Sequence, residues 1–304
     1  MLGLSTAWRA SQYEDAKQMI FEIKAAGFTE VELSFNLTHG MVGEIAGMVK
    51  EGQIKVVSLH NFCPIPDNLA REEALPDYYS LSSLDETERL EALYFTKRTI
   101  DTAQDMGARA VVLHCGRVDI PDKTRALIDL YQRGLKGSRE FDQVKDAFII
   151  QRQAAVKPYL ACALESIATL SRYAKKSGIL LGIETRFYYR EIPSLEELGI
   201  ILNQFKGSNV FYWHDTGHAQ VMDNLGLARH EEYLERYAPE MLGIHLHNLI
   251  GCSDHQAPHQ GDFDFYRLKP FLKENTLKII EAHEQATARD LKLSKDYLER
   301  VFHG

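Results

Sequence analysis

One pattern recurs along this sequence: an amphipathic helical segment, a glycine, and a short apolar run rich in β-branched residues. It occurs four times, and the glycines between helix and strand are Gly27, Gly52, Gly107 and Gly178. A glycine just past the last helical turn is a common helix stop, because it adopts the left-handed conformation without steric cost. Consecutive helix–strand units need crossover connections, and therefore a parallel sheet.

Eight segments have the nearly continuous apolar character of strands that are covered by helices. They are residues 1–6, 29–35, 54–60, 108–114, 179–185, 209–215, 241–247 and 277–283. Eight strand–helix units in 304 residues match the size of a (β/α)8 or TIM barrel. We therefore predict an α/β fold with one TIM-barrel domain over residues 1–304. A doubly wound open sheet is the alternative, but no glycine-rich phosphate-binding turn follows the first strand.

A helical insertion is predicted after the fourth strand, at about residues 116–155. Its charged, helix-like stretch over residues 125–148 indicates an excursion over the top of the barrel rather than a second domain. After the fifth strand, Ser194 followed by Glu197 three residues later predicts a capping box at the start of the next helix.

Composition narrows the classes of protein that this chain can represent. Its 35 Lys and Arg against 43 Asp and Glu give a formal charge of −8, which disfavours a nucleic-acid binder with a basic face. No apolar run approaches the roughly 18–20 residues of a membrane span, and the N-terminus lacks a signal-peptide pattern. The four cysteines form no CxxC pair, which disfavours a disulfide framework or a thiolate zinc site. We expect a cytoplasmic protein without nucleic-acid or membrane partners.

Every predicted strand from the third to the eighth delivers a potential metal ligand at its carboxyl-terminal end. In a TIM barrel these ends converge at the mouth, where catalytic groups lie. Burying so many titratable groups together would be costly unless a cation balanced them. The pattern therefore predicts a divalent metal site, and its candidate residues are His60, His114, Glu184, Asp215, His245 and Glu281.

The last four of these residues come from consecutive strands, five to eight, and are the predicted metal ligands. Three carboxylates and one imidazole suit Mn²⁺ or Zn²⁺, with Co²⁺ or Mg²⁺ as further possibilities. His60 and His114, together with Glu184, would form a second, more zinc-like site or would hydrogen-bond the substrate. His247 faces the same way as His245, which is the preferred ligand of the two. His214 and His283 are expected to point to the other face, in structural roles.

The strand ends resemble those of the xylose isomerase-like TIM-barrel superfamily, the sugar phosphate isomerase/epimerase group that is related to endonuclease IV. The resemblance covers nearly the whole chain except the insertion, and it rests on the motifs SLHNF, LHCG, GIETR, HDTGHA, GIHLHN, DHQAPHQGDFDF and IIEAH. It implies that the metal ligands shared by the epimerases are Glu184, Asp215, His245 and Glu281. It also implies that the additional zinc ligands of the endonuclease branch correspond to His60, His114, His218 and His255.

Three positions depart from the superfamily pattern. The endonuclease branch has an aspartate two residues before the histidine that corresponds to His255; this chain has Ser253 there, and Asp254 is the nearest carboxylate. A complete third metal site is therefore left open. Many relatives end the seventh strand in His-x-x-Asp, whereas this chain has Asn248 at the last position. Residues 259–261 replace a frequent Gly-x-Gly, so this loop has a different shape or gains a polar contact from its histidine.

The leading hypothesis is a metal-dependent isomerase or epimerase of a small sugar, sugar phosphate or sugar acid. A metal-stabilised enediolate would form as a carbon-bound proton leaves, with Glu184 and Glu281 as ligands and acid/base pair. His218, one short loop step beyond Asp215, would contact a substrate hydroxyl. Arg186 would orient a substrate anion or form a scaffold ion pair. Four aromatic residues would line the sugar site or pack in the core: Trp8, Phe62, Tyr188 and Trp213.

Two other reactions remain as alternatives. One is an endonuclease IV-like zinc phosphodiesterase, which the abundance of histidine favours and the acidic charge disfavours. The other is a metal-dependent lyase or dehydratase that acts on a similar substrate. A small-molecule carbohydrate is the expected partner, and the sequence does not predict an oligomeric state.

Overall fold

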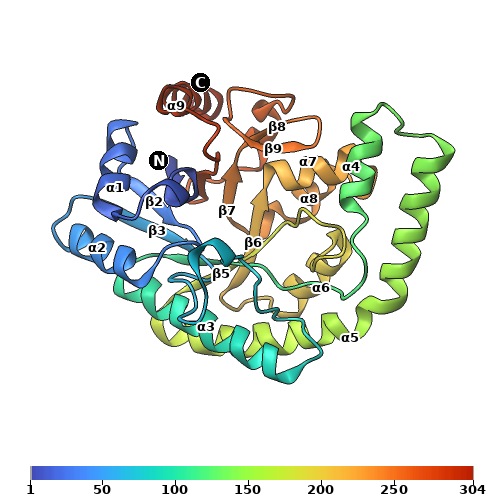
Figure 1. Ribbon diagram of the computed structural model, residues 1–304, viewed down its shortest axis with the longest axis horizontal. Helices are drawn as coiled ribbons and strands as arrows, with labels where there is room; N and C mark the ends of the chain where they lie inside the picture. Colours follow the sequence, from blue (N-terminus) through green and yellow to red (C-terminus); the bar gives the residue numbers. More distant parts are fainter. Residues whose placement is uncertain (1, 304) are drawn as a thin grey trace.

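In the computed structural model, which describes residues 2–303, eight parallel strands close into a barrel with helices around it (Figure 1). β10 pairs with both β1 and β7, which closes the cylinder. The predicted TIM barrel is confirmed, and each predicted strand segment contains one barrel strand. The strands are β1 (Leu2–Ser5), β2 (Glu30–Leu33), β3 (Lys55–His60), β4 (Ala110–Leu113), β5 (Leu180–Glu184), β6 (Val210–Asp215), β7 (Met241–Leu246) and β10 (Leu277–Ile280).

Helices cover the outside of the barrel. The four glycines predicted to stop helices all have positive φ angles, between 66° and 94°, as a left-handed helix stop requires. Five short 3₁₀ helices also occur in the described chain: η1 (Thr6–Trp8), η2 (Ala10–Gln12), η3 (Arg71–Glu73), η4 (Ala238–Glu240) and η5 (Phe265–Phe271). The α-helices of the described chain are α1 (Ala16–Ala25), α2 (His39–Lys50), α3 (Glu86–Asp105), α4 (Thr124–Gln132), α5 (Arg139–Ser177), α6 (Leu195–Gln204), α7 (Thr216–Asn224), α8 (His230–Tyr237) and α9 (Ala288–His303).

Side chains fill the inside of the barrel below its mouth. Trp213 is fully buried there, in an apolar cluster with residues such as Val112 and Leu242. Gly182 and Gly243 make room for its indole, since a Cβ at these positions would come within 2.8 Å and 2.3 Å of the ring. Trp213 is therefore a core residue and not part of a sugar-binding wall. Because the interior is packed, polar groups at the strand ends can meet only at the mouth.

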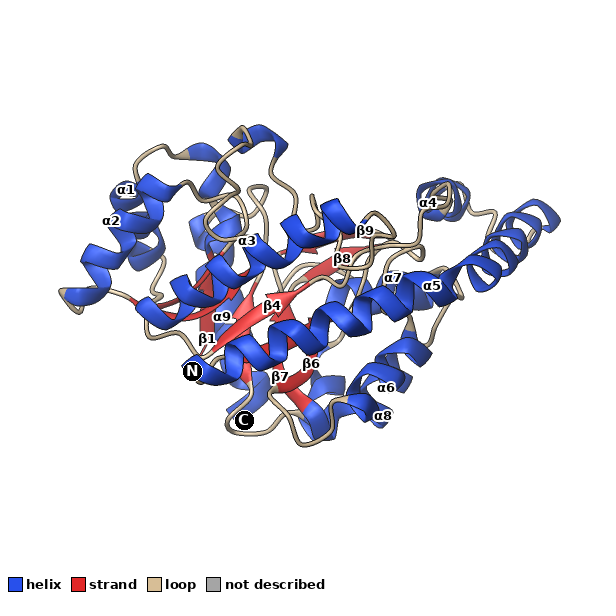
Figure 2. Ribbon diagram, turned by 90° about the horizontal axis from the view of Figure 1, so that it is seen from below, coloured by secondary structure: helices blue, strands red, loops and turns tan. Residues whose placement is uncertain are grey.

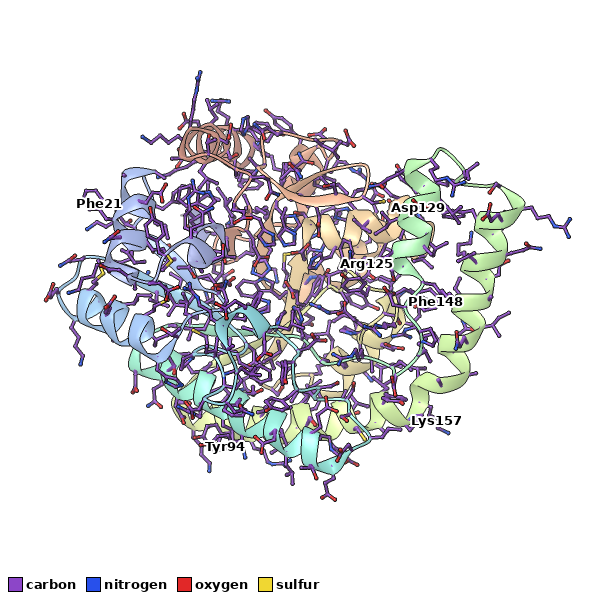
Figure 3. The ribbon with its side chains drawn as sticks, in the orientation of Figure 1. Phe21, Tyr94, Arg125, Asp129, Phe148 and Lys157 are labelled. Atoms are coloured by element: carbon purple, nitrogen blue, oxygen red, sulfur yellow. The ribbon has the colours of Figure 1, made fainter. Side chains whose placement is uncertain are left out.

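The insertion after β4 consists of α4 and the first part of α5. The sequence predicted a boundary near residue 155, but α5 continues through it without a break for 39 residues. Pro158 lies inside this helix, and α5 bends in this region rather than ending there (Figures 1 and 3, where Lys157 is labelled). Figure 2 shows the amino-terminal part of α5 reaching beyond the barrel, beside α4. The insertion contacts the loop after β5, because Tyr189 N donates to Thr124 Oγ1 at 3.0 Å.

A buried ion pair ties the insertion to the barrel. Arg152 of α5 donates through two nitrogens to the two carboxylate oxygens of Glu197, at 2.6 Å and 2.8 Å. Glu197 also forms the predicted capping box of α6 with Ser194. The same carboxylate therefore fixes the start of α6 and the position of α5.

A two-stranded hairpin follows β7 and lies outside the barrel sheet. Its strands β8 (Asn248–Ile250) and β9 (Ser253–Gln256) are antiparallel, with Gly251 at the turn in a left-handed conformation, φ 62°. Asn248 holds the next loop against this hairpin, because its Nδ2 donates to the carbonyls of Pro258 and Phe263. Within residues 2–303, no helix combines the length and the apolar character that a membrane crossing requires.

Candidate metal centre

Four ligand-type side chains converge at the carboxyl-terminal mouth of the barrel, and we call them the strand group: Glu184, Asp215, His245 and Glu281. Their ligand atoms all lie within 4.8 Å of one another. His245 Nδ1 is 2.7 Å from Glu184 Oε1, 3.0 Å from Glu281 Oε2 and 3.5 Å from Asp215 Oδ2. Ligand atoms about 2.1 Å from one cation lie about 3 Å apart at right angles, so this spacing fits a coordination shell.

Electrostatic interactions in the strand group favour ionised carboxylates. Burial alone would raise the pKa of Glu184, but the imidazoles of His114, His245 and His60 hold it well below its usual range. Burial also opposes ionisation of Glu281, yet His245 lowers the pKa of this carboxyl to about 2. Although burial alone would lower the pKa of His245, the surrounding carboxylates raise it well above its usual value. The negative field that attracts protons so strongly would also stabilise a divalent cation.

A second group shares Glu184 with the first, and we call it the β3–β4 group: His60, His114 and Glu184. His114 Nε2 lies 2.6 Å from Glu184 Oε2, and His60 Nε2 lies 3.6 Å from the same oxygen. Burial, together with the charge of Arg186, lowers the pKa of His114 to about 3. This imidazole is therefore neutral near pH 7, the form that binds a metal or accepts a hydrogen bond.

Asp215 is positioned by the start of a helix as well as by its strand. β6 ends at Asp215 and α7 begins at Thr216, so Asp215 is the N-cap of α7. Its Oδ1 accepts the backbone N–H of His218 at 2.7 Å, which satisfies one of the free amides of the first helical turn. His218 accordingly lies in this first turn and not on the short loop that the sequence indicated.

The third group comes from less regular elements, and we call it the hairpin group: His218, His247 and His255. Among the non-glycine residues that the structure describes, His255 alone has a positive φ, 55°. Its ring stacks between those of His247 and His283, with centroids 4.1 Å and 3.7 Å away. The expectation that His283 faces away from the site is therefore wrong. A left-handed non-glycine residue persists only where its surroundings fix it, and such residues concentrate at functional sites.

Gly217 allows the hairpin group to form. A Cβ at this position would lie 2.1 Å from a ring atom of His247, so only glycine lets that imidazole lie against α7. In addition, His247 Nδ1 accepts the backbone N–H of His255 at 2.9 Å, and its Nε2 lies 2.9 Å from Asp215 Oδ1. His247 thus connects the hairpin to the strand group.

Asp254 lies at the edge of the hairpin group. Its Oδ2 is 3.1 Å from His255 Nδ1 and 3.7 Å from His218 Nε2. Burial alone would raise the pKa of Asp254, but the neighbouring His255 lowers it strongly. The endonuclease pattern has a carboxylate at position 253, where this chain has serine, and Asp254 is the carboxylate next to that position. The third ligand-type residue of the hairpin group is His247 and not Asp254.

Arg186 lies between two buried glutamates. Its Nη1 donates to Glu184 Oε2 at 2.7 Å, and its Nη2 is 3.2 Å from Glu191 Oε1. The carbonyl of Glu191 accepts from Arg152 at 2.7 Å, so a line of contacts runs from α5 to Glu184. The sequence left two roles open for Arg186, a contact with a substrate anion and a scaffold ion pair. The observed contacts are those of a scaffold ion pair.

The loop of residues 257–263 is held from two sides. Asn248, where many relatives have aspartate, accepts the backbone N–H of Phe263 through Oδ1 at 2.9 Å in addition to its two donated bonds. His259 Nδ1 lies 2.8 Å from Ser294 Oγ on α9. Both departures from the superfamily pattern therefore fix this loop instead of adding ligands.

Sequence reasoning did not identify three residues at the mouth. Glu32 of β2 is fully buried and contacts His245. The ring of Phe35 makes an edge-to-face contact with His60, and the ring of Phe187 makes one with His218. The ring centroids are 5.7 Å apart in both pairs. Glu32 belongs to a short strand that also contains Glu30, and nothing in the local sequence shows which of the two glutamates reaches the mouth. The two phenylalanines lie shortly after the ends of β2 and β5, but nothing in their local sequence separates a mouth residue from a core residue.

The barrel and its three ligand groups define a class of protein, a TIM barrel with a metal-type site at its mouth. The family model described as xylose isomerase-like TIM barrel matches residues 20–297, and the chain belongs to this family. Solved structures with the same fold include a D-tagatose 3-epimerase-like protein (17% identity, TM-score 0.68, 99% of this chain and 97% of that chain).

The same fold occurs in the 3-keto-D-glucoside 4-epimerase YcjR from E. coli (15% identity, TM-score 0.68, 98% of each chain). It also occurs in the IolI protein, whose structure holds a zinc atom (14% identity, TM-score 0.66, 99% of this chain and 97% of that chain). No curated protein sequence matches the chain.

Proposed function

We propose that this protein is a divalent-metal-dependent epimerase or isomerase of a small sugar. The observation that supports the proposal most directly is the strand group, in which the ligand atoms of three carboxylates and one imidazole lie within 4.8 Å of one another at the mouth. The donor set fits Mn²⁺ or Zn²⁺, with Co²⁺ or Mg²⁺ as further candidates. The epimerases among the structural neighbours share the fold, which is compatible with this chemistry.

Glu184 and Glu281 are the proposed acid/base pair. Their pKa values lie below the usual range, despite burial, because imidazoles face them, so both are ionised near neutrality and can accept a proton. A cation at the strand group would supply a Lewis acid for a substrate carbonyl and its neighbouring hydroxyl. One glutamate, as a carboxylate, removes the proton from the carbon beside that carbonyl. The other first takes up a proton from solvent or from a substrate hydroxyl, and then returns it to the carbon as the neutral acid. Arg186 holds Glu184 in place, and His218 contacts a substrate hydroxyl.

Solvent exchange tests this proposal. The protein loaded with Mn²⁺ is incubated in D₂O with a panel of ketoses, keto-sugars and sugar acids, and NMR follows deuterium at the carbon beside the carbonyl. We expect exchange with at least one class, loss of exchange in Glu281→Gln, and retention in Glu299→Gln, an exposed residue of α9. Absence of exchange across the panel would overturn the proposal, and a dehydrated product would indicate the lyase alternative.

A zinc phosphodiesterase is the second candidate, because the three ligand groups adjoin one another through Glu184 and Asp215. Activation of water for attack on phosphorus commonly uses clustered metal ions. Elemental analysis and cleavage of an abasic-site duplex distinguish the candidates. Three bound Zn²⁺ with cleavage that a chelator abolishes would favour the phosphodiesterase, whereas one bound Mn²⁺ without cleavage would favour the sugar enzyme.

A further inference from the structure

Glu32 lies across the barrel from the ligand that it contacts. It belongs to β2, whereas His245 belongs to β7, and β1 and β10 separate these strands in the closed sheet. Glu32 Oε1 is nevertheless only 2.9 Å from His245 Nε2, so both side chains point into the barrel. Both residues are fully buried. A buried carboxylate is costly unless its partners and its role compensate for the lost hydration.

The two nitrogens of His245 face different partners. Nδ1 points to the strand group, where Glu184 Oε1 lies 2.7 Å away and Glu281 Oε2 lies 3.0 Å away. Nε2 points to Glu32. A cation held by the strand group would therefore meet Nδ1, which leaves the proton of the neutral ring on Nε2, directed at the Glu32 carboxylate. A metal-bound imidazole whose other nitrogen donates to a carboxylate is oriented more firmly and is a stronger donor to the metal.

The second oxygen of Glu32 is also held. Ser58 of β3 donates from Oγ to Glu32 Oε2 at 2.7 Å, and the two residues are directly paired in the β2–β3 register. The β2–β3 register shifts immediately before this pair: Val31 pairs with Val56 and Glu32 with Ser58, so the additional residue is in β3. Ser58 and the strand backbone thus fix the carboxylate, and the carboxylate fixes His245.

We propose that Glu32 is a positioning residue for the metal centre, which sets the tautomer and the ring orientation of His245 so that Nδ1 binds the cation. This inference rests on the metal site of the proposed function. It does not depend on which substrate the protein converts, because its direct consequence is metal affinity.

Metal titration of the whole protein tests the inference. Dissociation constants for Mn²⁺ are measured by competition with a chromophoric chelator in the wild type, Glu32→Gln and Glu32→Met. We expect about tenfold weaker binding in Glu32→Gln, which keeps an acceptor oxygen without the charge, and up to about 100-fold weaker binding in Glu32→Met. The matched control is Glu30→Gln, which alters the same strand at a carboxylate that pairs with Lys55 and lies away from the strand group.

Two further measurements separate positioning from a general loss of structure. The visible absorption of Co²⁺ bound to the protein at saturation is expected to shift in Glu32→Gln and not in Glu30→Gln, because the bands report the donor strength of His245. Thermal unfolding of the metal-free variants shows whether the barrel is intact. If Glu32→Met does not fold, Glu32→Gln and Ser58→Ala decide, with a smaller loss of affinity expected for Ser58→Ala.

The outcomes are distinct. If folded Glu32→Gln and Glu32→Met bind Mn²⁺ within twofold of the wild type and leave the Co²⁺ spectrum unchanged, the positioning role is overturned while the metal centre stands. If the wild-type protein binds no divalent cation, both the positioning role and the metal-dependent function are overturned. If the affinity falls as expected and no sugar is converted, the positioning role is supported and only the proposed reaction fails.

Discussion

The strand group and the hairpin group are built in different ways, although they lie side by side. Each member of the strand group lies within one residue of the end of a barrel strand, so the hydrogen-bonded ladder fixes its position. The pairing of Asp215 with His245 in the β6–β7 register is an example. The hairpin group depends instead on the first turn of α7, on Gly217, and on the left-handed backbone of His255.

This structural difference suggests different roles for the two groups in the site. The strand group is built on regular barrel strands, and it holds the residues to which we assign proton transfer. The hairpin group is carried by segments that follow the barrel strands at the mouth, where related barrels vary and where the choice of reaction is made. If this division is correct, changes to the strand group should remove metal and activity together, whereas changes to the hairpin group should adjust them separately.

Glu184→Gln is expected to have the largest effect, because Glu184 belongs to both the strand group and the β3–β4 group. The substitution removes the charge that faces three imidazoles and Arg186, and it removes a proposed proton acceptor. We expect sugar exchange to fall about 10³- to 10⁴-fold, with loss of bound metal by elemental analysis. Glu196→Gln, at an exposed glutamate of α6, is the matched control. Full metal content and activity in Glu184→Gln would mean that the two groups do not function as a centre.

Removal of metal should destabilise the fold through the strand group. A cation at about 100 times its dissociation constant contributes about 2.7 kcal/mol to the free energy of unfolding. Calorimetry should therefore show a lower unfolding temperature after chelation, by several degrees for a chain of this size. The same treatment should barely change Glu184→Gln. An equal shift in the wild type and in this variant would place the stabilising cation elsewhere.

The fold and the strand group were accessible from the sequence because their signals are local and repeated. Helix–glycine–strand units predicted the barrel. A ligand-type residue at the end of every strand from the third to the eighth predicted the convergence of Glu184, Asp215, His245 and Glu281. The Ser194–Glu197 capping box was readable for the same reason, since its partners are three residues apart. In each case, a short-range pattern is sufficient once parallel strands are inferred.

The remaining features depend on contacts between distant segments. The insertion was predicted to end near residue 155, but the structure continues α5 through this point and accommodates Pro158 within the helix. Glu32 reaches His245 across the barrel, and no local pattern reveals which interior residue lies opposite another. His255 returns to the mouth only because β8 and β9 form a hairpin, and there it stacks on His283. Strand alternation puts His283 on the same face as Glu281, two residues before it, so the expectation that His283 faces away neglected this rule.

Gly217→Ala should disturb the hairpin group from the side of α7, where Gly217 lies against the His247 ring. The added Cβ would lie 2.1 Å from the His247 ring, which must move away from α7. We expect a loss of about 1–3 kcal/mol in the free energy of unfolding, as for other overpacked sites, measured by urea denaturation. Gly43→Ala is the control, because a Cβ there meets no atom within 4 Å in the middle of α2, and it should be neutral or slightly stabilising. Equal stability of the two variants would show that His247 has room to move.

His255→Asn distinguishes the two groups most sharply, and its effect on sugar exchange should be the smallest. Asparagine tolerates the left-handed conformation at φ 55°, so the variant removes an imidazole without straining the hairpin. We expect exchange within tenfold of the wild type and an unchanged metal content at the strand group, with His39→Asn, at an exposed residue, as control. A loss as large as that of Glu184→Gln would break the division between strand and hairpin groups. It would also favour the phosphodiesterase candidate, because that reaction would use the hairpin imidazoles directly.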